Sequence, residues 1–488
     1  MPESETPPEN PPPRNRQQSF SSLPPELRLP ILDLLVASAD SARHEKAALA
    51  SVCNEWRVVV EKSTFRSLLL HEGNGHQDVR AFHRIVHGRR RRLVRNLTMH
   101  ITLGLYGCEG CHREESGEEA DANNWRFTRA VRGLWSCLSR WPAVGGDAAA
   151  MTLEIKCGAL SDRQHFFRDA GDGGRHLLYG QSLQGRRFSL WGARKRLLGN
   201  LLDFVHQDGG ARPLLPKVRV VRRLRVNKSL YRSLSAAALR LLFESLVDLT
   251  VVCYQPRRGV DVQGQRARDE ANTALFRTLG PSARGVHLWE MQSPELHGDR
   301  YRPKPTNEEL VAAVVEVSYR LRDVTIYHAI DGADFFRLAS ARPGGARPMP
   351  AWPNLRFLVL SCRHLAFSGA QSEAYDLLLT AARAAMRMPR LGCMELWWGE
   401  VNGGYIFRYR VDRDAATVTV VATSEAAPHP DVLKAWRRVA YENTRHQLQR
   451  RAVVLKADAM VSSTAICRFL WLFLWLRESL QGDDAREP

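Results

Sequence analysis

The sequence predicts a chain of mixed α and β class (α+β or α/β), with a small helical domain near its N-terminus and a larger body behind it. Two observations predict this fold class. Apolar residues near the N-terminus recur at helical spacing, and strand-like runs alternate with helix-like stretches over the rest of the chain. With 488 residues, 44% of them hydrophobic, the chain is long enough for a small domain and one or two larger ones with buried cores.

Residues 1–22 are expected to form a disordered, proline-rich tail, because proline, Glu, Asn, Gln and Ser leave almost nothing apolar to bury. The tail has no apolar stretch of the kind found in secretory signals. The nine cysteines are an odd number and are scattered along the chain, which argues against a disulfide framework. We therefore expect a cytoplasmic or nuclear protein, or one found in both compartments.

Two amphipathic helices are predicted in residues 23–70. Leu27 and Ile31 begin an apolar stripe at i and i+4, and Leu34 and Leu35 continue it at i+7 and i+8. After a polar link over residues 36–48, a second stripe follows the same spacing. Two short helices cannot cover both stripes alone, so a partner or an attached domain is expected to cover them. The second stripe comprises Val52, Trp56, Val59 and Val60.

This segment resembles the F-box, whose members dock on a Skp-type adaptor of cullin-based ubiquitin ligases. The resemblance lies in Leu-Pro-Pro-Glu-Leu at residues 23–27 and in the Val-Cys-x-x-Trp pattern that ends at Trp56. Pro30 falls inside the first helix, and we expect the helix to restart there with Pro30 at its first position. An ordinary helical hairpin is the alternative. The residues that the resemblance assigns to adaptor binding are Leu23, Pro24, Pro25, Leu27, Ile31, Leu34, Leu35, Val52, Cys53 and Trp56.

Residues 71–400 are predicted to form a body of repeated β-α units. Strand-like runs that begin at Val218, Leu249, Val286, Val324 and Leu355 follow one another at intervals of 31 to 38 residues. A leucine-rich-repeat-like array and a single closed α/β domain both fit this pattern. The strand-like runs are residues 97–101, 151–155, 218–221, 249–252, 286–289, 324–327, 355–360 and 394–397, and the helix-like stretches include residues 127–141, 234–246, 307–321 and 372–388.

Residues 401–488 are predicted to form a separate C-terminal part with a β-hairpin and a helix. Two apolar runs at residues 405–411 and 417–423 are joined by a polar turn, and a helix is expected over residues 430–450. Residues 394–399 and 405–409 are similar to the uncharacterised C-terminal region of fungal F-box proteins. The apolar run at residues 465–476 contains an arginine and is too short to span a bilayer, so a buried helix or strand is expected.

Metal and cofactor signals are sparse, and we expect no cofactor. Cys108 and Cys111 have the spacing of two zinc ligands, but no second such pair exists in the chain. A reduced cysteine pair in a loop is the favoured interpretation. His83 and His87 stand at i and i+4 without the Glu of a zinc-protease motif, so they are interpreted as solvated or packing residues.

No catalytic motif is found, so a non-enzymatic protein is predicted. The sequence lacks a nucleophile elbow, a Walker-type loop, a dinucleotide fingerprint and a kinase signature. Ser161, Asp162 and His165 lie close in the sequence, which by itself does not make a catalytic triad. A helix start capped by Ser or Asp is the favoured interpretation of these residues.

Positive charge is the strongest competing signal. The formal net charge is +18, the isoelectric point is near 9.9, and four arginines run from Arg89 to Arg92. Such runs attract phosphate backbones and act as nuclear import signals. No zinc-finger, RNA-recognition or homeodomain pattern accompanies them, so nucleic acid is the less favoured partner. Further arginine clusters lie at residues 186–187, 194–196 and 219–225.

The sequence therefore predicts a non-catalytic receptor subunit of a cullin-based ubiquitin ligase. The F-box would dock on a Skp-type adaptor, and through it on a cullin, while the body holds a target protein. The basic charge of the body favours an acidic or phosphorylated target, because arginine pairs with such groups in two-pronged geometry. The alternatives are a basic nucleic-acid or chromatin binder, and an F-box protein that works with the adaptor outside a ligase.

Overall fold

The computed structural model describes fifteen stretches of the chain, and the following account concerns these alone. They form two compact units. The N-terminal unit contains residues up to Leu68 together with Gly88–Val94, and the body contains Leu69–His87 and the residues from Arg95 onward. The described residues are 20, 23–38, 43–73, 75–107, 109–143, 150–164, 190–205, 214–227, 231–292, 294–297, 304–341, 350–366, 371–424, 427–460 and 465–470. Apart from Phe20, the predicted tail of residues 1–22 lies outside them.

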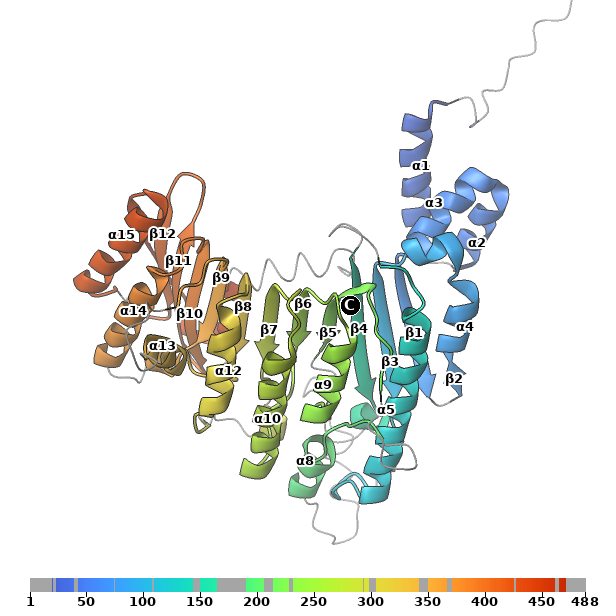
Figure 1. Cartoon of the computed structure of the whole chain (residues 1–488), viewed down its shortest axis with the longest axis horizontal. Helices are drawn as coiled ribbons and strands as arrows, with labels where there is room; N and C mark the ends of the chain where they lie inside the picture. Colours follow the sequence, from blue (N-terminus) through green and yellow to red (C-terminus); the bar gives the residue numbers. More distant parts are fainter. Residues whose placement is uncertain are drawn as a thin grey trace, which may run out of the picture. The chain divides into compact units, whose positions relative to one another are not determined.

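The N-terminal unit has three α-helices where two were predicted. They are α1 (Pro25–Ser38), α2 (Arg43–Val52) and α3 (Asn54–Thr64) (Figure 1). The short 3-10 helix η3 (Gly88–Arg92) belongs to the same unit. The predicted second helix is divided at Cys53, whose extended backbone (φ −160°, ψ 177°) cannot continue a helical turn. The predicted link over residues 36–48 is largely helical as well, because α1 extends to Ser38 and α2 begins at Arg43.

The expected restart of the first helix at Pro30 is wrong, because α1 runs through Pro30 without interruption. Proline has no N–H to donate to the carbonyl of Glu26, and its ring crowds that carbonyl. Pro30 is exposed on the helix. The helix is held in place by packing on α3, where Leu32 and Val36 meet Val59 and Val60.

The body is built on one sheet with thirteen described strands. Its parallel part runs from β3 to β10 in chain order, and β10, β11 and β12 pair antiparallel before β13 joins β12 in parallel. At the other end of the sheet, β1 pairs antiparallel with β2. The strands are β1 (Ser67–Gly73), β2 (His76–Gln77), β3 (Asn96–Thr102), β4 (Met151–Gly158), β5 (Val221–Val226), β6 (Val251–Tyr254), β7 (Gly285–Trp289), β8 (Asp323–Tyr327), β9 (Phe357–Ser361), β10 (Cys393–Glu400), β11 (Gly403–Val411), β12 (Ala416–Ala422) and β13 (Leu448–Val454).

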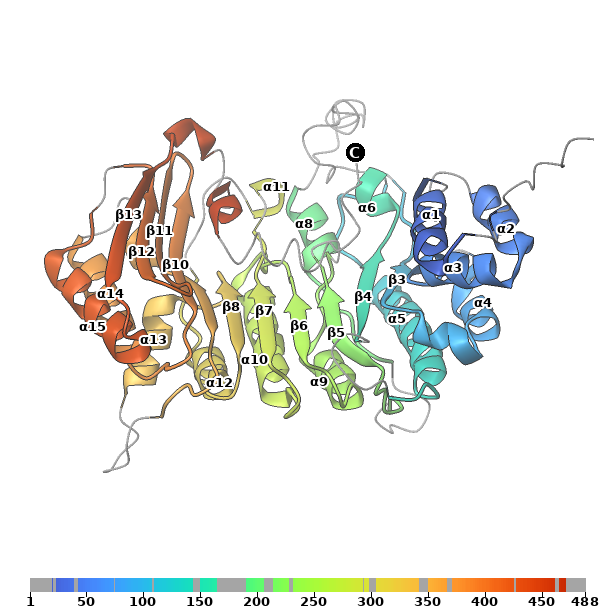
Figure 2. The ribbon, with the colours of Figure 1, turned by 90° about the horizontal axis from the view of Figure 1, so that it is seen from above.

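The longer helices of the body line one face of this sheet. The helices that contact one another in a row are α9, α10, α12, α13, α14 and α15, and Figure 2 shows α9, α10 and α12 on one side of the strands. Strands that follow one another in chain order place successive crossovers on the same face, as stacked β-α repeats do. The helices are α4 (Asp78–Ile85), α5 (Gly117–Leu138), α6 (Ser161–Gln164), α8 (Leu190–Leu198), α9 (Ala236–Ser245), α10 (Val262–Thr278), α11 (Pro294–His297), α12 (Glu308–Ser318), α13 (Gly332–Ser340), α14 (Gln371–Ala385) and α15 (Pro430–Thr444), with the 3-10 helices η5 (Arg363–Leu365), η6 (Ala457–Ala459) and η7 (Ala465–Phe469).

The two ends of the sheet differ in how their second face is covered. In β4 buried and half-buried residues alternate strictly, whereas all five residues of β8 are buried. Over β8–β12 the second face is covered by η7, where Ile466 and Cys467 pack with Trp397 and Ile406. The first part of the C-terminal apolar run, residues 465–470, is thus a packed segment, and residues 471–476 lie outside the described part. None of the described helices is long and apolar enough to cross a membrane.

The C-terminal hairpin is confirmed, and the helix after it is shorter than predicted. β11 and β12 pair antiparallel, and Trp436 of α15 packs on Phe407 and Tyr409, with ring centroids 5.1 Å and 4.9 Å away. The predicted helix to residue 450 ends instead at Thr444. Arg445 adopts a left-handed conformation (φ 63°) that stops the helix, and β13 follows.

Candidate docking surface

Helix α1 carries apolar side chains on two opposite faces. Leu32 and Val36 are 1% and 3% exposed and form part of the core of the N-terminal unit. At about 100° per residue, Leu27, Ile31, Leu34 and Leu35 fall on a different side of the helix, and these four are 54%, 38%, 71% and 39% exposed. We call these four residues the exposed α1 face. A helix that is apolar on both sides is normally covered on both sides.

The remaining residues that the F-box resemblance assigns to the adaptor divide into exposed and internal ones. Val52, at the end of α2, is 59% exposed, and Cys53 is also exposed. Trp56 is half-buried, packs against the core and meets Phe20 edge to face at 5.5 Å between ring centroids. Trp56 therefore contributes to internal packing, unlike the exposed residues. Pro24 and Pro25 are exposed and Leu23 is half-buried.

Local contacts explain how α1 is placed on α3. The backbone N–H groups of Leu27 and Arg28 both donate to the carbonyl of Pro24, which starts the helix. The Arg28 guanidinium then lies 3.4 Å from a carboxylate oxygen of Glu55 on α3. Both charges are partly exposed, so this pair contributes only modestly to stability. The burial of Leu32 and Val36 is the larger contribution.

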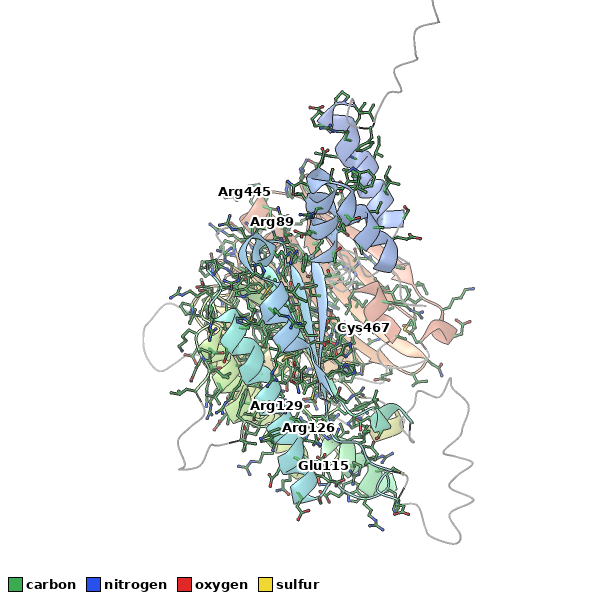
Figure 3. The ribbon with its side chains drawn as sticks, turned by 90° about the vertical axis from the view of Figure 1, so that its right-hand side faces the viewer. Arg89, Glu115, Arg126, Arg129, Arg445 and Cys467 are labelled. Atoms are coloured by element: carbon green, nitrogen blue, oxygen red, sulfur yellow. The ribbon has the colours of Figure 1, made fainter. Side chains whose placement is uncertain are left out.

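Two arginines of the run from Arg89 to Arg92 form ion pairs inside the N-terminal unit. Arg89, on η3 (Figure 3), lies 3.0 Å from Glu61, and Arg90 lies 2.8 Å from the other oxygen of the same carboxylate. Arg90 also stacks over the ring of Phe65, 5.0 Å from its centroid. Burial alone would raise the pKa of Glu61, but the hydrogen bonds and charges of Arg90 and Arg89 lower it. These two arginines thus hold η3 against α3.

A buried ionic network joins three segments of the body. Arg232 donates to Glu115 at 3.0 Å and to Asp162 at 3.2 Å, and all three side chains are 2% exposed. Glu115 (Figure 3) lies two residues before the start of α5, and Asp162 lies in α6 after β4. Asp162 also accepts a hydrogen bond from Tyr106, and burial together with this carboxylate raises the pKa of that phenol. The network ties the segments that follow β3, β4 and β5.

The hydrogen bonds in and beside this network show what Ser161 and Asp162 do in the structure. The hydroxyl of Ser161 accepts from the backbone N–H of Tyr106, and Asp162 accepts from the backbone N–H of Ala159 as well as from Arg232. Both side chains therefore stabilise the loop. His165, the third member of the sequence cluster, lies outside the described residues. Sequence reasoning could not find the network, because its members are separated by tens of residues.

A second buried ionic network lies after β7. Lys304 donates to Asp269 at 2.7 Å and to Glu290 at 2.9 Å, and Gln265 donates to both carboxylates. Burial raises the pKa of Asp269. It would also raise the pKa of Glu290, but Lys304 lowers it. A cavity of about 630 Å³ lies beside this network and is also lined by Arg258.

The described structure does not bring the candidate metal-ligating residues together in one site. Cys108 lies outside the described residues, and Cys111 is buried. The Nδ1 atom of His83 lies 3.5 Å from the Sγ atom of Cys137, whereas His87 is exposed. Among the residues that can be described, no three His, Cys, Asp or Glu side chains gather in a way that could hold a metal ion.

The face of β4 and β5 opposite the helices is polar and basic. Glu154 accepts from Asn227 at 2.7 Å, and the ammonium group of Lys156 lies 3.7 Å from the same carboxylate. Arg223 and Arg225 lie on the neighbouring strand β5 and are half-exposed. In register, Arg225 stands beside Glu154. We call this surface the basic sheet face; its positive side chains outnumber its carboxylate.

Residues 278–473 match the model of a family of unknown function, DUF6546. These residues contain β7 to β13 and the helices between them, so the similarity concerns the second half of the body. It does not extend to the N-terminal unit. No curated protein matches the chain.

Proposed function

We propose that this protein is the non-catalytic receptor subunit of a cullin-based ubiquitin ligase. The N-terminal unit acts as an F-box that binds a Skp-type adaptor, and the body acts as a leucine-rich-repeat-like array that holds a target protein. The cytoplasm, the nucleus or both are the proposed site of action. The single observation that carries the proposal is the exposed α1 face, whose four apolar residues stay 38% to 71% exposed in the described part of the chain.

The energetics of this face favour a partner. Fully burying one large apolar side chain contributes about 1.5–3 kcal/mol, so four half-exposed residues leave a substantial part of that free energy unused. Val52 and Cys53, both exposed at the junction of α2 and α3, add to the apolar surface of the same unit. The four residues of the exposed α1 face are all apolar, and the core of a protein interface is likewise depleted of charged residues.

The body contributes binding without chemistry in this proposal. Ligase activity follows from proximity, because a tethered target presents its lysines at high effective concentration to the ubiquitin-carrying enzyme. The buried networks around Arg232 and Lys304 pair the acidic groups that could otherwise act as acids or bases. The basic sheet face, with Arg223 and Arg225, supports an acidic or phosphorylated target.

Co-purification tests the proposal. The tagged full-length chain is expressed with a Skp-type adaptor and a cullin, and compared with a variant carrying Leu34→Ala and Leu35→Ala. The matched control is Leu29→Ala, because Leu29 is 45% exposed on the same helix but lies about 140° around the axis from Leu34. The double variant is expected to lose both partners while the control keeps them.

Other outcomes identify the alternatives. Recovery of the adaptor without cullin supports an F-box protein that acts outside a ligase. Recovery of nucleic acid alone, lost as salt is raised, supports a basic nucleic-acid or chromatin binder. If the double variant still recovers the adaptor as well as the wild type does, the docking assignment is wrong.

A further inference from the structure

Strand β13 is an open edge of the body's sheet. It pairs with β12 along Leu448–Val454, and no described strand pairs with its other side; Figure 2 shows it at one end of the row of strands. The strand at the opposite end, β2, has only two residues. Natural proteins protect sheet edges by keeping them short or covering them, because an open edge accepts a further strand. β13 has seven residues, and no described strand covers its outer edge.

The backbone groups at this edge can be assigned. The N–H of Leu455 donates to the carbonyl of Ala422 at 2.7 Å, so it points toward the β12 side. Successive residues of a strand direct their N–H and C=O groups to alternate sides. The groups of Arg451 and Val453 therefore point toward β12 as well. The free edge presents the N–H and C=O groups of Arg450, Ala452 and Val454.

The side chains of β13 are as open as its backbone edge. All residues from Gln449 to Val454 are exposed, with Val453 at 46% and Val454 at 60%. Alternation places Arg451 and Val453 on one face of the strand and Arg450 and Val454 on the other. Neither Arg450 nor Arg451 forms an ion pair with a described residue. The edge thus presents Arg450 and Arg451, which have no described charge partner. Ala452 follows, and then the two apolar side chains of Val453 and Val454.

The charges argue against a second copy of the chain as the occupant. An antiparallel pair of two β13 strands centred on Arg451 would set the Arg451 guanidinium groups of the two copies opposite each other, and like charges directly across a strand pair are destabilising. A pair centred on Ala452 would set each arginine opposite a valine, so neither arginine would gain an acidic partner. The net charge of +18 adds to the repulsion between copies. An acidic strand gains from the same arginines and can cover the two valines with apolar side chains of its own.

We propose that β13 is a β-augmentation site, to which an extended segment of a partner protein adds as a further strand. The segment carries two adjacent acidic residues and two adjacent apolar residues, with one residue between the two pairs. The backbone of the segment pairs with Arg450, Ala452 and Val454, and its side chains supply the specificity. This inference goes beyond the proposed function, because it involves no residue of the exposed α1 face and requires no adaptor.

Peptide binding to the full-length chain tests the proposal. Fluorescence anisotropy is measured with short labelled peptides that contain Glu-Glu-Thr-Val-Val or the reverse order, since the strand direction is open. A matched peptide with Lys in place of each Glu is the control. At least one acidic peptide is expected to bind about tenfold or more tightly than its lysine counterpart. Equal binding of acidic and lysine peptides would overturn the proposal.

Two variants separate backbone pairing from simple charge attraction. Ala452→Pro removes one N–H from the free edge and leaves both arginines, whereas Ala452→Val keeps the N–H and serves as its control. The proline variant is expected to lose about tenfold in affinity, and the valine variant is expected to bind like the wild type. Arg450→Glu with Arg451→Glu is expected to reverse the preference toward the lysine peptide. Unchanged binding by both the proline variant and the charge-reversed variant would refute the edge assignment.

Hydrogen exchange of the wild-type chain tests strand addition without depending on whether a variant folds. On binding the acidic peptide, the amides of Arg450, Ala452 and Val454 are expected to become protected, while those of Arg451 and Val453 stay as they were. Protection of neither set would contradict strand addition. A wild-type dimer that forms with rising concentration and is lost in Ala452→Pro would show that the occupant is a second copy. The Leu34→Ala, Leu35→Ala variant should bind peptide normally even if the proposed ligase function fails.

Discussion

Leu32 and Leu34 stand two residues apart on α1, and their exposed fractions are 1% and 71%. Two residues correspond to about 200° of rotation, so the two leucines point in nearly opposite directions. Leu32 packs with Val59 and Val60 inside the N-terminal unit, whereas Leu34 belongs to the exposed α1 face. The same residue type on one helix thus serves folding in one case and is available for binding in the other.

This difference predicts that the same substitution has a large effect on stability at Leu32 and a small one at Leu34. Leu32→Ala is expected to lower the free energy of unfolding of the N-terminal unit by about 2–5 kcal/mol, because it leaves a cavity in the core. Leu34→Ala is expected to change it by less than about 0.5 kcal/mol. Hydrogen exchange of the amides of α1 and α3 measures both. If the amides of α1 and α3 were equally protected from exchange in the two variants, Leu32 and Leu34 would not differ in burial as described.

Pro30→Ala is expected to stabilise the N-terminal unit. Pro30 lies inside α1, where it gives up one backbone hydrogen bond and crowds the carbonyl of Glu26. Replacing it restores the N–H donor and should raise the free energy of unfolding of this unit, by up to about 3 kcal/mol. Slower amide exchange along α1 is the readout. A loss of stability would indicate that the proline ring makes favourable contacts that outweigh the missing bond.

Arg232→Met is expected to destabilise the body strongly. The substitution removes the guanidinium from Glu115 and Asp162, leaving two buried carboxylates without their charge partner, which costs about 3–5 kcal/mol. Arg225→Met, on the half-exposed basic sheet face, is the matched control and should have little effect. Urea unfolding compares the two. Adding Glu115→Gln and Asp162→Asn to Arg232→Met should recover part of the loss, and no recovery would argue against an ionic origin.

His287 predicts a pH dependence of stability. Its side chain is buried, its Nδ1 atom has no hydrogen-bond partner among the described residues, and burial lowers its pKa from 6.5 to about 4. Below pH 6.5 the unfolded chain therefore binds a proton that the folded chain does not, so stability falls from about pH 6.5 toward pH 4.

The loss attributed to His287 between pH 7 and pH 5.5 should be about 1 kcal/mol. His287→Leu removes the titrating group, so its urea midpoint should vary less with pH over this range than that of the wild type. An identical pH dependence in both proteins would show that His287 does not titrate as its burial implies.

Much of the body could be predicted from the sequence, because its strands are short apolar runs between breaks. β11 and β12 follow from two such runs joined by a polar turn, and the structure pairs them antiparallel. β13 was missed because Arg445, a residue that seldom ends a helix in a left-handed conformation, gives no stop signal such as glycine would.

In the N-terminal unit, the sequence alone could not predict which side of α1 is buried. Spacing alone identified Leu27, Ile31, Leu34 and Leu35 as a stripe, but it could not tell that Leu32 and Val36 form the buried side. A helix that is apolar on both sides gives no clear periodic signal, and its inner face is decided by what it packs against. The buried networks around Arg232 and Lys304 depend on contacts between distant segments and leave no local pattern.

The affinity of the full-length chain for a purified Skp-type adaptor, measured by isothermal titration calorimetry, tests the central claim most directly. The wild type and Leu29→Ala are expected to bind with affinities within about threefold of each other. Leu34→Ala with Leu35→Ala is expected to weaken binding by about thirtyfold or more, which corresponds to about 2 kcal/mol. Wild-type affinity in the double variant, or no measurable binding by the wild type, would contradict the account.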